Sequence, residues 1–194
     1  APAFLVNALT DTALIREGFG TYPPTKGTPE LRTAIADFVN RRYRLEPALD
    51  PELNVLPVTG TREALFAFAQ AVIEPQPNCV TVMPNPFYQI YEGAALLAGS
   101  KPYYVNCEPG NGYQPDFDAV PEEIWQRCQL LYLCSPGNPT GAVMGVPQLQ
   151  TLISLSDEYN FVIASDECYS EIYMDEQNPP AGLLEAASLL GRDD

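Results

Sequence analysis

Histidine is absent from the 194-residue sequence. Its absence excludes Ser-His-Asp and Cys-His catalysis and every metal site that uses a histidine ligand. Basic residues are also scarce: 10 of them stand against 25 acidic residues, which gives a net charge of −15 at pH 7. Such a charge repels phosphate backbones, so we expect no nucleic-acid partner. A small anionic ligand is still compatible with it, because backbone N–H groups can hold an anion locally.

Long apolar runs and paired cysteines are missing as well. No apolar run approaches the length of a membrane span, and the N-terminus lacks the basic start of a signal peptide. The five cysteines form an odd set without a C-x-x-C pair, which favours reduced thiols over a disulfide scaffold. We therefore expect a cytoplasmic protein that binds no metal and does not enter a membrane.

The sequence does contain a regular alternation of apolar strand patterns with helical patterns. We expect strands at 54–59, 79–83, 102–105, 130–134 and 161–165, and helices at 2–15, 29–43, 61–74, 87–98, 149–159 and 182–190. Thr28 is the expected N-cap of the second helix. The helix at 61–74 is apolar nearly all round, so we expect it to be buried. The alternation predicts a three-layer α/β/α domain whose mostly parallel sheet is covered on both faces.

The first two strands are followed by motifs at the sheet edge where parallel sheets bind their ligands. Gly60-Thr61-Arg62 stands between a strand and a helix, which suits a phosphate because free N–H groups and the helix dipole favour an anion. A tight turn that needs Gly60 for its backbone geometry explains the motif equally well. Tyr88 could stack on a flat ring, or it could be a core aromatic that starts a helix.

Two later strand ends carry hydrogen-bonding side chains. Asn138 lies inside Ser135–Gly141, where two prolines and two glycines form a rigid turn, and we interpret it as a positioned polar group. Asp166 follows an apolar strand and needs a partner. That partner is either a basic side chain or a protonated ring nitrogen of a ligand, with a helix N-cap as a further alternative.

Together these motifs describe one ligand. The Gly60 turn suits a phosphate and Tyr88 suits a flat ring. Asn138 with Tyr169 suits a ring oxygen, and Asp166 suits a protonated ring nitrogen. The ligand that combines these groups is pyridoxal phosphate (PLP).

The motifs resemble, in sequence order, those of class I/II aminotransferases of fold type I, which are PLP enzymes. The matching segments are Tyr22–Gly27, Thr59–Leu65, Asn85–Tyr88, Asn138–Gly141 and Asp166–Tyr169. The resemblance covers essentially the whole chain. The motifs and the segment Pro179–Leu184 are also similar to succinyldiaminopimelate transaminases of the bacterial lysine pathway.

The resemblance implies a cofactor role for each matching residue. Asp166 would pair with the pyridine nitrogen, and Asn138 and Tyr169 would hydrogen-bond the phenolic oxygen of the ring. Tyr88 would stack on the ring. The phosphate would be held by the residues at the start of the helix at 61–74, which are Gly60, Thr61 and Arg62.

The resemblance also implies substrates and a partner. Tyr22 would reach the phosphate in the neighbouring subunit of a homodimer. The Gly27 region would line the substrate entrance, and Asn138 would also touch the substrate carboxylate. The implied substrates are an amino acid and a 2-oxo acid, and the narrower expectation is N-succinyl-LL-2,6-diaminopimelate in lysine biosynthesis.

One part of the family pattern is missing from the chain. The Schiff-base lysine of the family lies in a Ser-x-x-Lys-type segment, but the only lysines here are Lys26 and Lys101, and we expect neither to replace it. We interpret residues 1–194 as a partial PLP-binding large domain and expect the fragment itself to be inactive. Its N-terminal helices and inter-subunit loop would occupy 1–45, and an α/β core without its last two strands would occupy 46–194. The strand at 54–59 would then lack an in-sheet neighbour.

Two other functions remain open at this stage. One is a different fold type I PLP enzyme, such as a carbon–sulfur lyase or a cyclopropane-carboxylate synthase, which would use the same cofactor residues. The other is a non-catalytic binding or dimerisation module, which the absent lysine favours. Reduction with borohydride in the presence of PLP separates an enzyme from a module.

Overall fold

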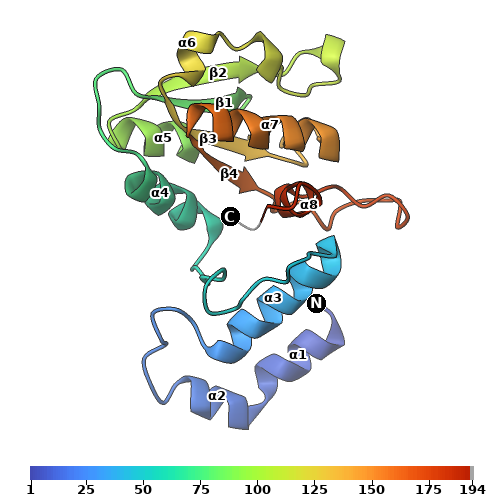
Figure 1. Ribbon diagram of the computed structural model, residues 1–194. Coiled ribbons are helices and arrows are strands. Elements are labelled where there is room, and N and C mark those ends of the chain that lie inside the picture. Colours follow the sequence, from blue (N-terminus) through green and yellow to red (C-terminus); the bar gives the residue numbers. More distant parts are fainter. Residues whose placement is uncertain (193–194) are drawn as a thin grey trace. The chain divides into compact units, whose positions relative to one another are not determined.

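The computed structural model describes residues 1–192, which belong to two compact units (Figure 1). The first unit holds residues 1–40 and 48–57, and the second holds 41–47 and the chain from residue 58 onward. Within the described residues, every helix is too short or too polar to cross a membrane.

The first unit is helical. It contains α1 (Ala3–Thr10), α2 (Thr12–Gly18) and most of α3 (Pro29–Tyr43). The prediction of one helix at 2–15 is wrong, because Asp11 has an extended backbone and its carboxylate accepts hydrogen bonds from two N–H groups of the next turn. Asp11 thus caps α2 instead of continuing α1. The predicted cap of α3 is confirmed, since the Thr28 hydroxyl accepts a hydrogen bond from Leu31 N–H at 3.2 Å.

The second unit contains a parallel sheet with the strand order β2-β1-β3-β4. Its strands are β1 (Val80–Asn85), β2 (Lys101–Asn106), β3 (Cys128–Cys134) and β4 (Val162–Asp166). Its helices are α4 (Thr61–Val72), α5 (Gln89–Leu97), α6 (Glu122–Trp125), α7 (Val146–Tyr159) and α8 (Leu183–Leu189), with 3-10 turns η1 (Pro109–Asn111) and η2 (Phe117–Ala119). The predicted α/β fold is confirmed. The sequence pattern misses α6, η1 and η2, because a single turn is too short to display helical periodicity.

Helices cover both faces of this sheet (Figure 1). Successive residues of β3 point to opposite faces. Leu131 and Leu133 join an apolar cluster with α7 and α8, whereas Leu130 and Tyr132 join a second cluster with α4 and α5. All four side chains are fully buried, which explains why β3 is a nearly continuous apolar run.

The helix α4 is less buried than its composition predicts. Ala69 is its only buried residue, and Phe68 is 41% exposed. The expectation of a helix buried on all sides is therefore wrong. An apolar composition does not say how many sides will be covered, and α4 packs with one side against α5 and β3.

The segment 54–59 forms no strand in the described structure, so that prediction is also wrong. Leu56 and Val58 are both exposed. A strand this short is stable only when its N–H and C=O groups pair with a neighbour. The strands of the sheet pair only with one another, and none supplies those hydrogen bonds.

Candidate functional site

The carboxyl ends of β1, β3 and β4 open into one cavity of about 470 Å³, which we call the strand-end cavity. The parallel register pairs Cys134, the last residue of β3, with Asp166, the last residue of β4. The cavity is lined by Thr61, Pro84, Pro86, Phe87, Tyr88, Gln89, Tyr91, Cys134, Asn138, Pro139, Asp166, Cys168 and Tyr169. Five of the predicted site residues therefore lie around one space: Thr61, Tyr88, Asn138, Asp166 and Tyr169.

Asp166 is buried, and a hydrogen bond fixes its side chain. The hydroxyl of Tyr91 donates to Asp166 Oδ2 at 2.6 Å. The ring of Tyr91 stacks on the ring of Tyr132, with centroids 4.5 Å apart and planes within 8° of parallel. Burial and, after it, the hydrogen bond to Asp166 raise the pKa of Tyr91 well above its ordinary value. Tyr91 is therefore a neutral hydrogen-bond donor to the carboxylate.

Sequence reasoning missed Tyr91. Two signals pointed to it: it lies one helical turn after Tyr88, and a tyrosine in an apolar helix needs a partner for its hydroxyl once it is buried. The rings of Tyr88 and Tyr91 are 6.0 Å apart in an edge-on arrangement. Only the tertiary structure identifies the partner as Asp166.

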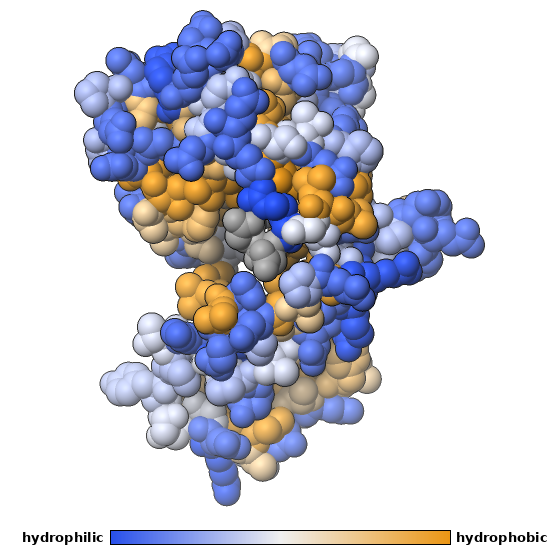
Figure 2. Space-filling model, in the orientation of Figure 1, coloured by the Kyte–Doolittle hydropathy of each residue, from blue (hydrophilic) through white to orange (hydrophobic). Residues whose placement is uncertain are grey.

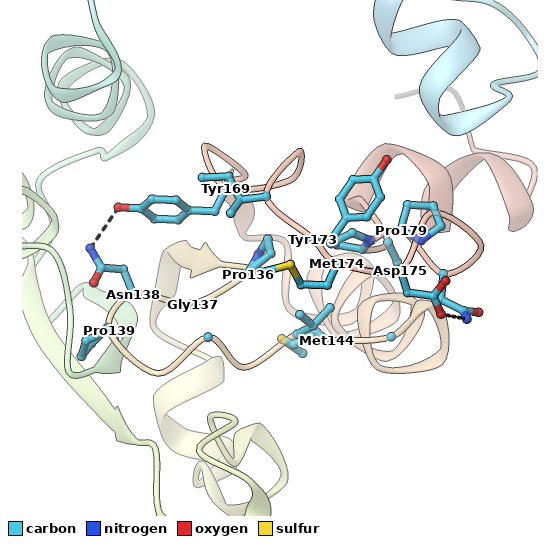
Figure 3. A pocket seen from close by; sticks show the side chains of 17 residues that line it. Pro136, Gly137, Asn138, Pro139, Met144, Tyr169, Tyr173, Met174, Asp175 and Pro179 are labelled. Atoms are coloured by element: carbon cyan, nitrogen blue, oxygen red, sulfur yellow. Dashed lines mark hydrogen bonds between the residues drawn. The ribbon is translucent and has the colours of Figure 1, made fainter.

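Asn138 and Tyr169 meet at one side of the strand-end cavity. Asn138 Nδ2 donates to the hydroxyl oxygen of Tyr169 at 3.0 Å (Figure 3). The turn that carries Asn138 is closed by a hydrogen bond from Gly137 N–H to the Ala142 carbonyl at 2.8 Å. Gly141 has a φ of 71°, a value that favours glycine. The turn thus presents Asn138 to the loop after β4.

The start of α4 has a glycine N-cap and lacks a side-chain cap in the described structure. Gly60 is the N-cap, with a φ of 98° that favours glycine, and no side chain caps the first N–H groups of this helix in the described structure. Arg62 Nε donates to the Tyr88 hydroxyl at 2.7 Å, and its guanidinium lies 5.6 Å from the centre of the Tyr88 ring. This hydrogen bond raises the pKa of Arg62. The pair links the start of α4 to the start of α5.

Tyr22 and Gly27 belong to the first unit. The Tyr22 side chain is almost fully exposed. The Gly27 carbonyl accepts a hydrogen bond from Arg32 Nη1 at 2.7 Å, so this loop is held to α3. The roles of Tyr22 at a neighbouring subunit and of Gly27 at the substrate entrance stay predictions.

The lysines offer no group at the strand-end cavity. Lys101 is the first residue of β2, at the amino end of the sheet, and its ammonium donates to Asn78 Oδ1 at 2.9 Å. The side chain of Lys26 lies in the first unit, and neither lysine lines the cavity.

Two thiols line the cavity beside Asp166. Burial raises the pKa of Cys134, and burial followed by the nearby Asp166 raises the pKa of Cys168 to about 11. Both thiols therefore remain protonated at neutral pH, which makes them weak nucleophiles. Among the described residues, no cluster of acidic side chains and thiols is suited to hold a metal ion.

A second, larger cavity of about 810 Å³ adjoins the first, and we call it the outer cavity. The two cavities share Asn138, Pro139 and Tyr169. Met144 and Met174 also line the outer cavity (Figure 3). The hydrogen-bonded pair Asn138–Tyr169 thus lies at the boundary between the two spaces.

The chain thus combines an α/β fold with a cavity at the carboxyl ends of its parallel strands. It matches the family "Aminotransferase class I and II" over residues 2–191 and belongs to that family. Enzymes of this family depend on PLP.

Individual relatives agree with this assignment. The chain is 34% identical over 160 residues to an LL-diaminopimelate aminotransferase of Aquifex aeolicus. This match covers 82% of the chain and 40% of the relative. An aminotransferase structure from Neisseria meningitidis matches 98% of this chain and 47% of that chain, with 46% identity and a TM-score of 0.88. The structure of aminotransferase AspB from Helicobacter pylori matches 99% of this chain and 48% of that chain, with 34% identity and a TM-score of 0.87. The chain thus spans less than half the length of these relatives.

The residues present fit PLP. A buried carboxylate suits the protonated ring nitrogen, because an ion pair offsets the cost of burying charge. The aromatic ring of Tyr88 at the cavity wall suits a flat ring, and the amide and hydroxyl of Asn138 and Tyr169 suit its phenolic oxygen. The uncapped start of α4 suits the phosphate.

Proposed function

We propose that the protein containing this chain is a PLP-dependent aminotransferase that moves an amino group between an amino acid and a 2-oxo acid. The observation that carries the proposal is the buried Asp166 carboxylate, held by Tyr91 at the wall of the strand-end cavity. When bound, PLP supplies an electron sink that stabilises negative charge at the substrate's alpha carbon. A buried carboxylate at its ring nitrogen keeps that nitrogen protonated, which strengthens the sink.

The other site residues are proposed to bind and orient the cofactor. Asn138 and Tyr169 would hydrogen-bond the phenolic oxygen, and their mutual hydrogen bond supports this role. Tyr88 would stack on the ring, steadied by the hydrogen bond from Arg62. The N–H groups at the start of α4, from Thr61 onward, would hold the phosphate, with Gly60 giving the close approach.

We propose a diaminopimelate-type amino donor. The names of several curated relatives, LL-diaminopimelate aminotransferases, support the free amino acid. The motif resemblance described above supports N-succinyl-LL-2,6-diaminopimelate, the substrate form in lysine biosynthesis that we predicted. Asn138, at the boundary of the two cavities, is the proposed contact for the substrate carboxylate, with the Gly27 region at the entrance.

We further propose a cytoplasmic homodimer in which Tyr22 reaches the neighbouring subunit. Two observations support the dimer: Tyr22 is almost fully exposed, and no residue of the apolar helix α1 is buried. The absence of paired cysteines supports the cytoplasm.

The test uses the full-length natural protein with PLP. We expect borohydride reduction to attach the cofactor to one lysine, and we expect transamination of one of the two diaminopimelate donors with 2-oxoglutarate as acceptor. Comparison of kcat/KM for the two donors decides between them. Labelling without transamination would point to another fold type I enzyme, and no cofactor uptake would point to a non-catalytic module. For residues 1–194 alone, we expect no specific label at Lys26 or Lys101.

A further inference from the structure

Tyr91 is the described side chain that holds the Asp166 carboxylate through a short hydrogen bond, 2.6 Å from hydroxyl oxygen to Oδ2. It also lines the strand-end cavity. Tyr91 is only 1% exposed, so almost none of its side chain reaches solvent. We propose that Tyr91 is a positioning residue that fixes the Asp166 carboxylate. In this position the carboxylate would share a proton with the ring nitrogen of PLP, and Tyr91 would keep that proton on the nitrogen. This inference rests on the proposed function.

The direction of the effect follows from the chemistry of the contact. A hydrogen bond donated to a carboxylate stabilises its charged form and lowers its affinity for a proton. Asp166 would share a proton with the ring nitrogen, and the Tyr91 hydrogen bond therefore shifts that proton toward the nitrogen. A positive ring nitrogen draws electrons more strongly, so Tyr91 would act on the reaction through Asp166 without touching the substrate.

The surroundings of Tyr91 allow it to hold one orientation. Its ring is stacked on Tyr132, and the hydroxyl of Tyr132 donates to the Leu65 carbonyl of α4 at 2.7 Å. On α5, the following residues Ala94 and Ala95 are fully buried. The ring of Tyr91 is thus held by a stack and by the buried side of α5, and its hydroxyl remains directed at Asp166.

Tyr132 provides a matched control. Tyr91→Phe and Tyr132→Phe each remove one hydroxyl from the same buried stack, and each removes one hydrogen bond to an acceptor on a different element. A purely structural role of Tyr91 predicts that the two variants behave alike. A positioning role predicts that only Tyr91→Phe changes the cofactor site, whereas both lower the melting temperature.

The experiment measures the bound cofactor directly in the full-length natural protein. PLP carrying ¹⁵N in its ring is added to the apo forms of wild type, Tyr91→Phe and Tyr132→Phe. We expect Tyr91→Phe to raise the dissociation constant of PLP roughly tenfold, the typical effect of one hydrogen bond to a charged group. We also expect the ring ¹⁵N resonance of PLP bound to Tyr91→Phe to move toward the unprotonated value. In Tyr132→Phe, the dissociation constant of PLP should stay within about twofold of wild type and the resonance should not move.

A second substitution protects the test against a variant that does not fold. Replacing Tyr91 with 3-fluorotyrosine keeps the shape and makes the hydroxyl a stronger donor, so the ring ¹⁵N resonance should move further toward the protonated value. Unchanged resonances in both Tyr91 variants, in a wild type that binds PLP, would overturn the inference alone. A wild-type protein that takes up no PLP would overturn the proposed function instead.

Discussion

At the scale of single residues, the ring of Tyr43 leaves no room for a side chain at position 182. A Cβ atom added to Gly182 would lie 2.5 Å from Tyr43 Cζ. Tyr43 cannot move freely, because it is buried and its hydroxyl donates to Glu167 Oε2 at 2.9 Å. We expect Gly182→Ala to lower the free energy of unfolding by about 1–3 kcal/mol.

Urea unfolding monitored by circular dichroism measures this change. Gly93→Ala in α5 is the control, because no atom lies within 4 Å of a Cβ at that position. We expect it to be neutral or to stabilise the helix by up to about 1 kcal/mol. Equal losses in the two variants would contradict the steric explanation.

Buried tyrosine hydroxyls make the stability depend on alkaline pH. Burial raises the pKa of Tyr132 to about 12, and burial followed by the charge of Glu167 raises the pKa of Tyr43 to about 12, both from 10. The folded state therefore holds these protons more tightly than the unfolded state. Their stabilising contribution is complete below pH 10 and is lost as the pH rises from 10 to 12.

Above pH 10, we expect the free energy of unfolding to fall by up to about 1.4 kcal/mol per pH unit for each such tyrosine. Urea unfolding at pH 9, 10 and 11 measures it. Tyr132→Phe should make this pH dependence weaker. Tyr113→Phe is the control, because Tyr113 is exposed, and it should leave the pH dependence as in wild type. A flat stability curve between pH 9 and 11 in wild type would refute the prediction.

At the scale of elements, the last turn of α3 holds the loop between β4 and α8. Arg42 Nε donates to Glu171 Oε1 at 2.6 Å, and Arg42 Nη2 donates to the carbonyls of Ser170 and Pro180 at 3.3 and 3.0 Å. Glu167, at the start of this loop, accepts a hydrogen bond from Leu183 N–H of α8 at 2.8 Å. The loop that carries Tyr169 is thus hydrogen-bonded to α3 through Arg42 and to α8 through Glu167.

We expect Arg42→Ala to loosen this loop and to lower the free energy of unfolding by about 1–2 kcal/mol, because it removes the donor of two carbonyls and a partly exposed ion pair with Glu171. Hydrogen exchange measured by mass spectrometry should rise in the peptides that cover residues 167–182. Arg41→Ala, an exposed neighbour on the same helix, is the control and should leave this exchange unchanged. Identical exchange in the two variants would show that the loop does not depend on Arg42.

The success of sequence reasoning at this scale depended on local signals. The strands β1 and β3 could be predicted, because each is a largely apolar run that is buried on both faces of the sheet. The strand β4 could be predicted from its apolar residues, although its first residue, Val162, is exposed. The segment 54–59 has the same composition, but a strand also requires a partner, which composition cannot reveal. The break at Asp11 was likewise decided by one side-chain cap inside an otherwise continuous apolar pattern.

At the scale of the whole molecule, the site could be predicted where topology alone brings residues together. Asn138 and Asp166 follow neighbouring parallel strands, so their meeting at one sheet edge follows from the fold. Tyr91 could not be assigned to Asp166 in this way, because its partner depends on how α5 packs over the sheet. Tyr22 and Gly27 belong to a different unit, and their proposed roles require a test on the assembled protein.

That test concerns the proposed homodimer. The helix α1 exposes Phe4 by 70% and Leu9 by 75%, and none of its residues is buried. Figure 2 shows apolar side chains at the surface over this part of the chain. An eight-residue apolar helix has little stability in water by itself, and burying such side chains against a second copy contributes about 1.5–3 kcal/mol for each one.

We therefore expect Leu9→Asp to convert the full-length protein from dimer to monomer at micromolar concentration, because a charge would replace an apolar contact in each subunit. Sedimentation velocity measures the mass. Leu189→Asp is the control, since Leu189 is 66% exposed on α8 and the proposed dimer does not use it. If Tyr22 completes the phosphate site of the neighbouring subunit, the Leu9→Asp monomer should also bind PLP more weakly than the control. A Leu9→Asp protein that remains a dimer would remove α1 from the interface, whereas a monomer with unchanged PLP affinity would refute the role of Tyr22.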